Sequence, residues 1–389
     1  MVPEGLVRDR VREDVIKLDS IYQYLISRGL VKTLAQLEAE TEYPYPGASQ
    51  VSLDLLIDTY LASNAHSVEK DSTEGIPIPG VCVLEVDSAI PSFHGMSNPT
   101  CVVWHPSDSE ILLTGGADSR VVMVKSGEIL DSFTLPSPPL SIDWAESNDV
   151  AIACMGGELV WMNVADKISF IKSTKPHNNS RVNSVKFSTS FAASCGKDIS
   201  ALIWKKISGV YEIIASVRCM REIASIAWAA DDVVCVAETG NCMIQLHKVD
   251  ENVLKPIGEI CMNLSLSDPR TEYTALAMCV EGKFLAVSTS RNSALLFSLP
   301  KKGETCTPLK VFYGMSVGIY DVPAISFSID CSFVYVTSDK EILVFECATA
   351  HKAFTIEISN SRTVRGMAHH RLFDQIATVS FDKQLSILK

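Results

Sequence analysis

The chain of 389 residues lacks any uninterrupted run of about 18 apolar residues, which is the minimum for a membrane-spanning helix. Its first residues alternate Arg with Asp and Glu and include no apolar stretch of the kind found in signal peptides. None of the twelve cysteines forms a Cys-x-x-Cys pair, so zinc-ribbon and thiol-redox motifs are missing too. We therefore expect a cytoplasmic or nuclear protein with reduced cysteines, no membrane contact and no bound metal.

Basic residues are also fewer than acidic ones: the chain has 34 Lys and Arg but 46 Asp and Glu, which gives a net charge of -12. Because duplex nucleic acid is bound through clustered Lys and Arg, direct nucleic-acid binding is not expected. The sequence contains no Gly-x-Ser-x-Gly elbow, and no Walker-type lysine follows its paired glycines. These absences predict a protein that is not an enzyme and uses no cofactor.

What the sequence does contain is a repeat. Between Cys101 and Lys389, seven units each combine short apolar strands with a turn that usually holds Asp or Asn. A period of 40 to 50 residues with several short strands per unit is typical of a β-propeller. The pattern predicts an all-β, seven-bladed propeller, whose first strands are anchored by Trp104, Trp144, Phe187, Trp228, Met278, Phe327 and His370.

Polar residues recur at fixed places within these units. Asp118 lies in the tight turn of the first unit, and Asp198 and Asp382 occupy the same place in two others, where a short carboxylate can accept hydrogen bonds from the turn's backbone. In the third unit, Asp198 is joined by His177, Ser194 and Trp204. A nucleophilic triad is the alternative interpretation, but the recurrence of the Asp favours a structural network.

The first unit, CVVWHPSDSEILLTGGADSRVVMV, resembles a WD repeat, and the four polar and aromatic residues of the third unit match that family's structural tetrad. The Trp-Asp dipeptide itself is absent, so the repeats are diverged. A Trp-Asp-x-Arg string, with which some ubiquitin-ligase receptors of this family bind their adaptor, is absent as well. The resemblance implies a protein-binding platform.

Ring closure requires a strand from elsewhere, because the chain stops at the third strand of the last blade. The segment Val81–Val86 has strand composition, and we expect it to become the outer strand of that blade. The propeller is therefore predicted to span residues 80–389, with residues 80–90 closing the last blade.

Residues 12–41 have helical rather than strand periodicity. Seven positions have the spacing of a known motif, namely Ile21, Tyr24, Leu25, Gly29, Thr33, Leu37 and Glu40. In these positions the segment resembles the LisH motif, and this resemblance implies a homodimerising module within residues 1–42. The alternative is an ordinary helical hairpin packed on the propeller. Residues 43–79 are predicted to form a short helix and a linker. The apolar stripe expected to form the dimer contact contains Ile21, Tyr24, Leu25, Leu34 and Leu37.

The two longest intervals between repeats predict loops on a single face of the propeller, where they are either tolerated insertions or the partner-binding surface. We expect Arg270, Tyr273, Tyr320 and Asp321 to be exposed there and to contact a protein or peptide partner. The LisH and WD-repeat resemblance, which covers most of the chain, implies a non-catalytic dimeric adaptor. Relatives of this layout act in microtubule-motor regulation, splicing, transcriptional repression and ubiquitin ligation. The alternative function is the substrate receptor of a ubiquitin ligase.

Overall fold

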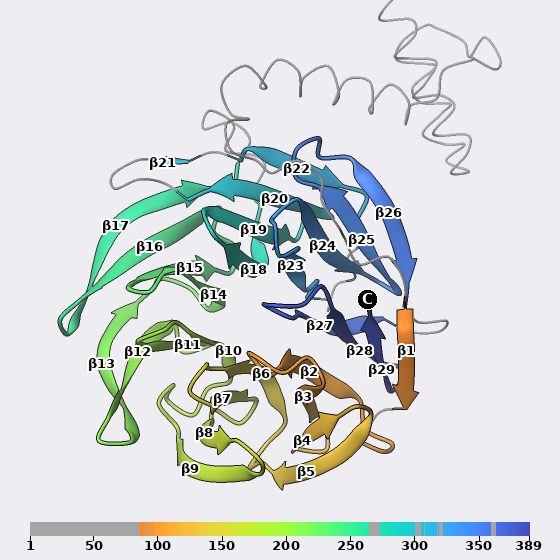
Figure 1. The fold of residues 1–389 in the computed structure, drawn as a ribbon. Coiled ribbons are helices and arrows are strands. Elements are labelled where there is room, and N and C mark those ends of the chain that lie inside the picture. Colours follow the sequence, from red (N-terminus) through yellow and green to blue (C-terminus); the bar gives the residue numbers. More distant parts are fainter. Residues whose placement is uncertain are drawn as a thin grey trace, which may run out of the picture. The chain divides into compact units, whose positions relative to one another are not determined.

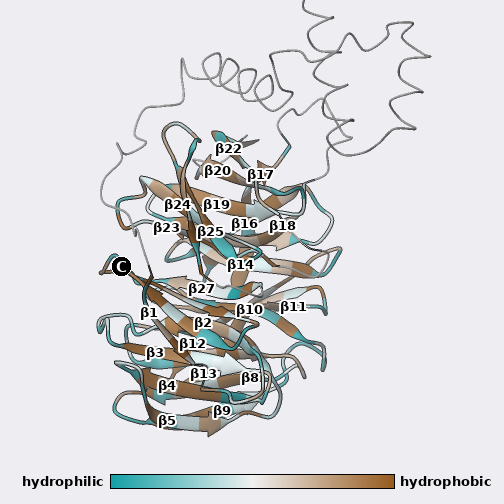
Figure 2. Ribbon diagram, turned by 90° about the vertical axis from the view of Figure 1, so that its right-hand side faces the viewer, coloured by the Kyte–Doolittle hydropathy of each residue, from teal (hydrophilic) through white to brown (hydrophobic). Residues whose placement is uncertain are grey.

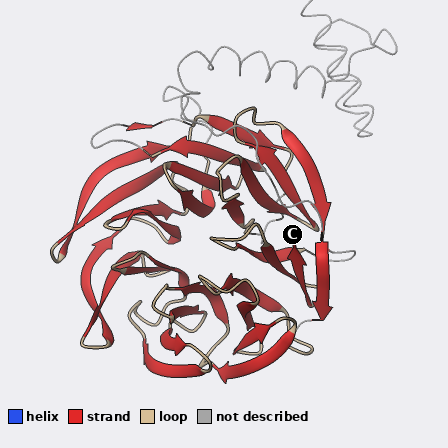
Figure 3. Ribbon diagram, in the orientation of Figure 1, coloured by secondary structure: helices blue, strands red, loops and turns tan. Residues whose placement is uncertain are grey.

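The computed structural model describes residues 86–91, 93–263, 273–299, 305–306, 308–316, 318, 322–358 and 363–389. All of them belong to one compact unit, Ile76–Lys389. Every regular element within these ranges is a β-strand (Figure 3). The predicted LisH-like module of residues 1–42 and the predicted linker of residues 43–79 lie outside the described residues, so both stay predictions.

The strands form seven sheets arranged around a central axis, each built on four antiparallel strands, which confirms the predicted seven-bladed β-propeller (Figure 1). In each blade we call the strands a to d, from the axis outward. The strands of blades one to four are β2 (Pro99–Trp104), β3 (Ile111–Gly116), β4 (Arg120–Lys125) and β5 (Glu128–Thr134); β6 (Pro139–Trp144), β7 (Asp149–Cys154), β8 (Leu159–Val164) and β9 (Ile168–Thr174); β10 (Val182–Phe187), β11 (Ala192–Gly196), β12 (Ser200–Ile207) and β13 (Val210–Arg218); β14 (Ile223–Ala230), β15 (Val233–Glu238), β16 (Met243–Asp250) and β17 (Val253–Cys261).

The remaining three blades follow the same plan. Their strands are β18 (Ala275–Glu281), β19 (Phe284–Thr289), β20 (Ser293–Ser298) and β22 (Lys310–Tyr313); β23 (Ile325–Phe327), β24 (Phe333–Ser338), β25 (Glu341–Glu346) and β26 (Lys352–Glu357); β27 (Val364–His369), β28 (Ile376–Ser380), β29 (Gln384–Leu388) and β1 (Val86–Pro91). The two-residue strand β21 (Thr305–Cys306) leaves blade five and pairs in parallel with the outer strand of blade four.

The ring closes through the segment that precedes blade one. Strand β1 pairs antiparallel with β29, from Val86 opposite Leu388 to Pro91 opposite Gln384. Of the predicted strand Val81–Val86, only Val86 is among the described residues, and it is the first residue of β1, which extends beyond the prediction to Pro91. An outer strand is buried on one face only, so β1 tolerates the polar residues Asp87 and Ser88. Apolar composition is therefore a weak guide to the bounds of an outer strand.

The hydrophobic core is divided among the junctions between blades. Seven apolar clusters are present among the described residues, and each joins two consecutive blades, the last joining blade seven to blade one. Figure 2 shows the strands as largely hydrophobic. Middle strands face a neighbour on both sides, so all six residues of β7 are buried. Burying a Val, Leu, Ile or Phe side chain contributes about 1.5–3 kcal/mol, and these junctions make the propeller a rigid support for its loops.

Candidate protein-binding face

The alternating direction of the strands sorts the loops onto two faces. Connections from strand d of one blade to strand a of the next share one face with the b–c turns, and we call it the D–A face. The a–b and c–d turns lie on the opposite face, which we call the A–B face. On the D–A face each b–c turn is bonded to the connection before it, as when the backbone N–H of Lys197 donates to the Arg181 carbonyl (3.0 Å) and that of Thr239 to the Glu222 carbonyl (2.8 Å). The two kinds of loop thus form one layer.

Blade three contains the predicted polar network, and the structure brings its four residues together. His177 Nδ1 bonds to Asp198 Oδ1 (2.8 Å) and Nε2 to Ser194 Oγ (2.9 Å), while the Trp204 indole N–H donates to Ser194 Oγ (2.9 Å). Burial lowers the pKa of His177 despite the neighbouring carboxylate, so the ring is neutral at physiological pH. The network fixes the connection into blade three against its b–c turn.

Blade one has a shorter version of this network that the sequence analysis missed. His94 bonds to Asp118 Oδ1 through Nδ1 (2.9 Å) and to Thr114 Oγ1 through Nε2 (3.1 Å). His94 lies 24 residues before its Asp, compared with 21 in blade three, and it precedes the first recognisable repeat. The available signal was Thr114, which holds the strand position that Ser194 occupies in blade three. In the last blade, Asp382 accepts hydrogen bonds from the Ser380 hydroxyl and from the Gln384 backbone N–H (3.2 Å).

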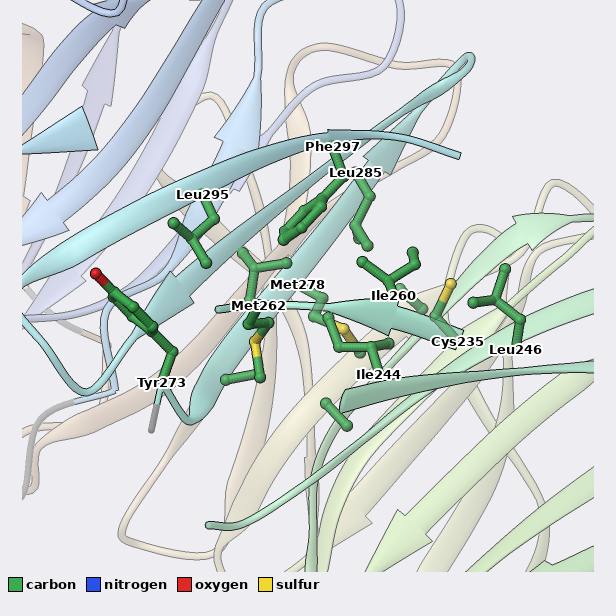
Figure 4. Close-up of a cluster of buried hydrophobic side chains, with 14 residues drawn as sticks. Cys235, Ile244, Leu246, Ile260, Met262, Tyr273, Met278, Leu285, Leu295 and Phe297 are labelled. Atoms are coloured by element: carbon green, nitrogen blue, oxygen red, sulfur yellow. The ribbon is translucent and has the colours of Figure 1, made fainter. Parts of the chain in front are cut away.

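One of the predicted partner-binding residues is not exposed. The side chain of Tyr273 is only 7% exposed and belongs to the cluster between blades four and five, with Met262 and Leu295 (Figure 4). The prediction failed because Tyr273 lies directly before β18, where its ring fills the junction instead of extending from the loop. The other three residues, Arg270, Tyr320 and Asp321, lie outside the described residues.

The D–A face exposes a different group of side chains over blades two to four. Met220, in the connection from blade three to blade four, is 90% exposed. It is accompanied by four exposed cations, one in the same connection, two in the connection from blade two to blade three, and one in the b–c turn of blade three. We call this group the Met220 patch, and it consists of Lys175, Arg181, Lys197, Met220 and Arg221.

The carboxylates near the patch are turned inward. Lys175 and Arg181 have side chains 50% and 48% exposed, whereas those of Glu158, Asp198 and Glu222 are 9%, 4% and 24% exposed. Glu158 accepts the Ser137 hydroxyl (2.7 Å). Burial alone would raise the pKa of Glu158, but this bond and Lys175 lower it below its ordinary value, so the group stays charged. Cations therefore meet the solvent, while carboxylates are used within the fold.

Backbone hydrogen bonds hold the Met220 connection in place. The buried carboxylate of Glu238 accepts the backbone N–H groups of Met220 (3.1 Å) and Arg221 (2.9 Å). The Asn183 amide donates to the Ile223 carbonyl (2.7 Å) and to Glu222 Oε1 (2.9 Å). The exposed methionine is thus presented by a connection that is bonded on both sides.

A cavity of about 270 Å³ opens where the inner strands end on the A–B face. Its lining contains both signs of charge, with Asp143 3.8 Å from Lys186 and with Glu281 near Arg371. Six of the seven predicted first-strand anchors line it, namely Trp104, Trp144, Phe187, Trp228, Met278 and Phe327. Two of these anchors also join blades, because the indole N–H groups of Trp104 and Trp228 donate to carbonyls of the preceding blade, at 3.0 and 2.9 Å.

Two further features concern metals and membranes. Within the described ranges, no group of three or more His, Cys, Asp or Glu side chains is placed to hold a metal ion. No helix suited to crossing a membrane occurs in the same part of the chain.

Comparison with known proteins adds no family. No family model matches the chain, and no curated protein matches it. The class of the protein is therefore given by its fold, a seven-bladed β-propeller, and this fold commonly mediates protein–protein interaction.

Proposed function

We propose that the protein is a non-catalytic, dimeric scaffold that binds protein partners through the D–A face of a WD-repeat-type propeller. The observation that carries this proposal is Met220, a large apolar side chain that is 90% exposed on a connection fixed by Glu238. Exposed apolar side chains among polar neighbours mark interaction surfaces, and methionine adapts readily to different partners. The network of His177, Ser194, Asp198 and Trp204 supports the WD-repeat assignment.

A scaffold rather than an enzyme is favoured by the state of Ser194. Its side chain is fully buried, and its oxygen is already bonded to Trp204 and His177, so a substrate carbonyl has no approach to it. The loops of the D–A face are also held by rigid strands, so they present the same surface each time a partner binds. Residence in the cytoplasm or nucleus fits the cysteines of the described residues, all of which are free thiols.

Dimerisation is proposed from the LisH resemblance. Light scattering should report a dimer for the full chain and a monomer for residues 76–389, because the apolar stripe of residues 21–37 has too little core to remain unpaired. Replacing Leu25 and Leu37 together by Glu should give a monomer of unchanged melting temperature. If the full chain is monomeric at micromolar concentration, the helical pair is an ordinary hairpin and the dimeric part of the proposal is wrong.

Partner capture that depends on the D–A face is the second requirement of the proposal. A scaffold of this kind should lose its partners when residues on that face are changed and keep them when the A–B face is changed. Arg270, Tyr320 and Asp321 stay candidate contacts for the same partners.

A further inference from the structure

We infer that the Met220 patch binds an acidic peptide segment that also carries a large apolar side chain. This inference rests on the proposed function and gives the partner its chemistry. It is carried by the arrangement of cations around a single carboxylate and by the methionine next to them.

Two cations of the patch, Arg181 and Lys197, act on Glu222. Arg181 forms an ion pair with Glu222, and Lys197 also acts on this carboxylate electrostatically. Burial would raise the pKa of Glu222, but hydrogen bonds from Arg181 and Asn183 lower it below its ordinary value. Arg221, the next residue back along the chain, uses one N–H on the Gly240 carbonyl. Glu222 thus meets two positive charges, while the third cation, Arg221, is bonded to a backbone carbonyl and not to a carboxylate.

Because the cations outnumber the carboxylate that they act on, some of their N–H donors are not used within the fold. A guanidinium has five N–H donors and an ammonium has three. Lys197 makes no side-chain hydrogen bond or ion pair within the described residues. Additional carboxylates from a partner would find these donors free, and charge-assisted hydrogen bonds are among the stronger ones.

Met220 restricts the partner further. A purely acidic segment would leave this side chain in water, and a purely apolar one would cover the cations without pairing them, which is unfavourable. Only a segment that combines carboxylates with a large apolar residue satisfies both parts of the patch. Burial of the methionine against such a residue would strengthen binding, because apolar surface would be removed from water.

Nucleic acid fits the patch less well than an acidic peptide. Single strands are held by aromatic side chains on which bases stack, and none of the five patch residues is aromatic. The net charge of -12 also opposes the approach of a long polyanion, whereas a short acidic segment meets mainly the local field. Because Glu238 already fixes the connection, little ordering is needed on binding.

A peptide library displayed on phage tests the inference with the full chain immobilised. Selected peptides should be enriched in Asp and Glu around Leu, Met or Phe. A synthetic copy of a selected peptide, labelled with fluorescein, should bind about tenfold more weakly to the double variant Lys197→Glu, Arg221→Gln and should dissociate more readily at high salt. Met220→Ser should weaken binding severalfold, because the apolar contact with the peptide is lost. The fold should be unaffected, since this side chain is 90% exposed.

The matched control makes the same change in charge on the other face. Lys167→Glu combined with Lys352→Gln alters two exposed lysines, one in the c–d turn of blade two and one at the start of β26, and it should leave peptide affinity unchanged. Neutral or basic selected peptides, equal losses in both double variants, or tighter binding of a single-stranded RNA oligonucleotide would each overturn the inference. If the acidic peptide does not bind but the full chain still captures proteins through its D–A face, the inference fails and the scaffold function stands.

Discussion

Removing residues 1–91 should lower the free energy of unfolding by about 3 kcal/mol compared with removing residues 1–75. The longer deletion takes away β1, whose half-buried Val86 and Ile90 cover part of blade seven. Val86 packs against the cluster between blades six and seven, and Asp87 pairs with Lys389 at 3.1 Å. Urea denaturation of the two shortened chains measures the difference.

The deletion should also change the solubility of the protein. Without β1, the backbone of β29 becomes an open edge, and an uncovered strand edge pairs readily with other chains. Light scattering after mild heating should show aggregation of the chain that begins at residue 92 well before that of the chain beginning at residue 76. If the two chains unfold at the same urea concentration, β1 does not hold the ring closed.

Replacing Asp149 by Ala should destabilise the protein by about 2–3 kcal/mol. Its carboxylate is 1% exposed and lies between blades two and three, where it accepts hydrogen bonds from Lys206 Nζ (2.6 Å), the Tyr211 hydroxyl (2.9 Å) and the Asn163 amide (3.1 Å). The ring of Tyr211 stacks on Trp161 with 4.0 Å between centroids. Removing the carboxylate therefore leaves several donors unpaired at a blade junction.

The contribution of Asp149 should depend on pH. Burial alone would raise its pKa, but the hydrogen bonds from Lys206, Asn163 and Tyr211 lower it below the ordinary value of 3.8. A depressed folded-state pKa gives stabilisation that is complete above the ordinary pKa and is lost as the pH falls through the folded-state value. The stability difference between the wild type and Asp149→Asn should thus shrink below about pH 4.

Tyr211→Phe is the matched variant for this junction. It keeps the ring stack on Trp161 and removes one hydrogen bond, so it should cost about 1 kcal/mol. Combining it with Asp149→Asn should cost less than the sum of the two separate changes. A stability difference between wild type and Asp149→Asn that stays constant from pH 7 to pH 3 would show that the Asp149 carboxylate is not held in its charged form.

The fold could be predicted from the sequence because propeller blades repeat local patterns. The spacing of Trp104, Trp144 and the later anchors reports one inner strand per blade, and the turn residues mark where strands b and c meet. Ring closure is non-local, however, and its residues depend on the register between the two ends of the chain. The parallel pairing of β21 with β17 has no local signal either, since only two residues take part.

The candidate site could be predicted only in part. The network around His177 follows from residue types at fixed places in a repeat, and the structure brings these residues together. The exposure of Met220 and the burial of Tyr273 depend on how neighbouring connections are held, which no single segment of sequence encodes. Arg270, Tyr320, Asp321 and the dimer stripe stay predictions.

The most direct test of the account is partner capture by matched variants of the full chain. Wild type, the Lys197→Glu, Arg221→Gln variant and the Lys167→Glu, Lys352→Gln control are each immobilised, and proteins retained from a cell extract are quantified by mass spectrometry. We expect the wild type and the control to retain the same proteins in the same yield, and the variant on the D–A face to lose most of the yield of the principal partner while keeping its melting temperature. Equal recovery of that partner by all three chains would contradict binding through the Met220 patch on the D–A face.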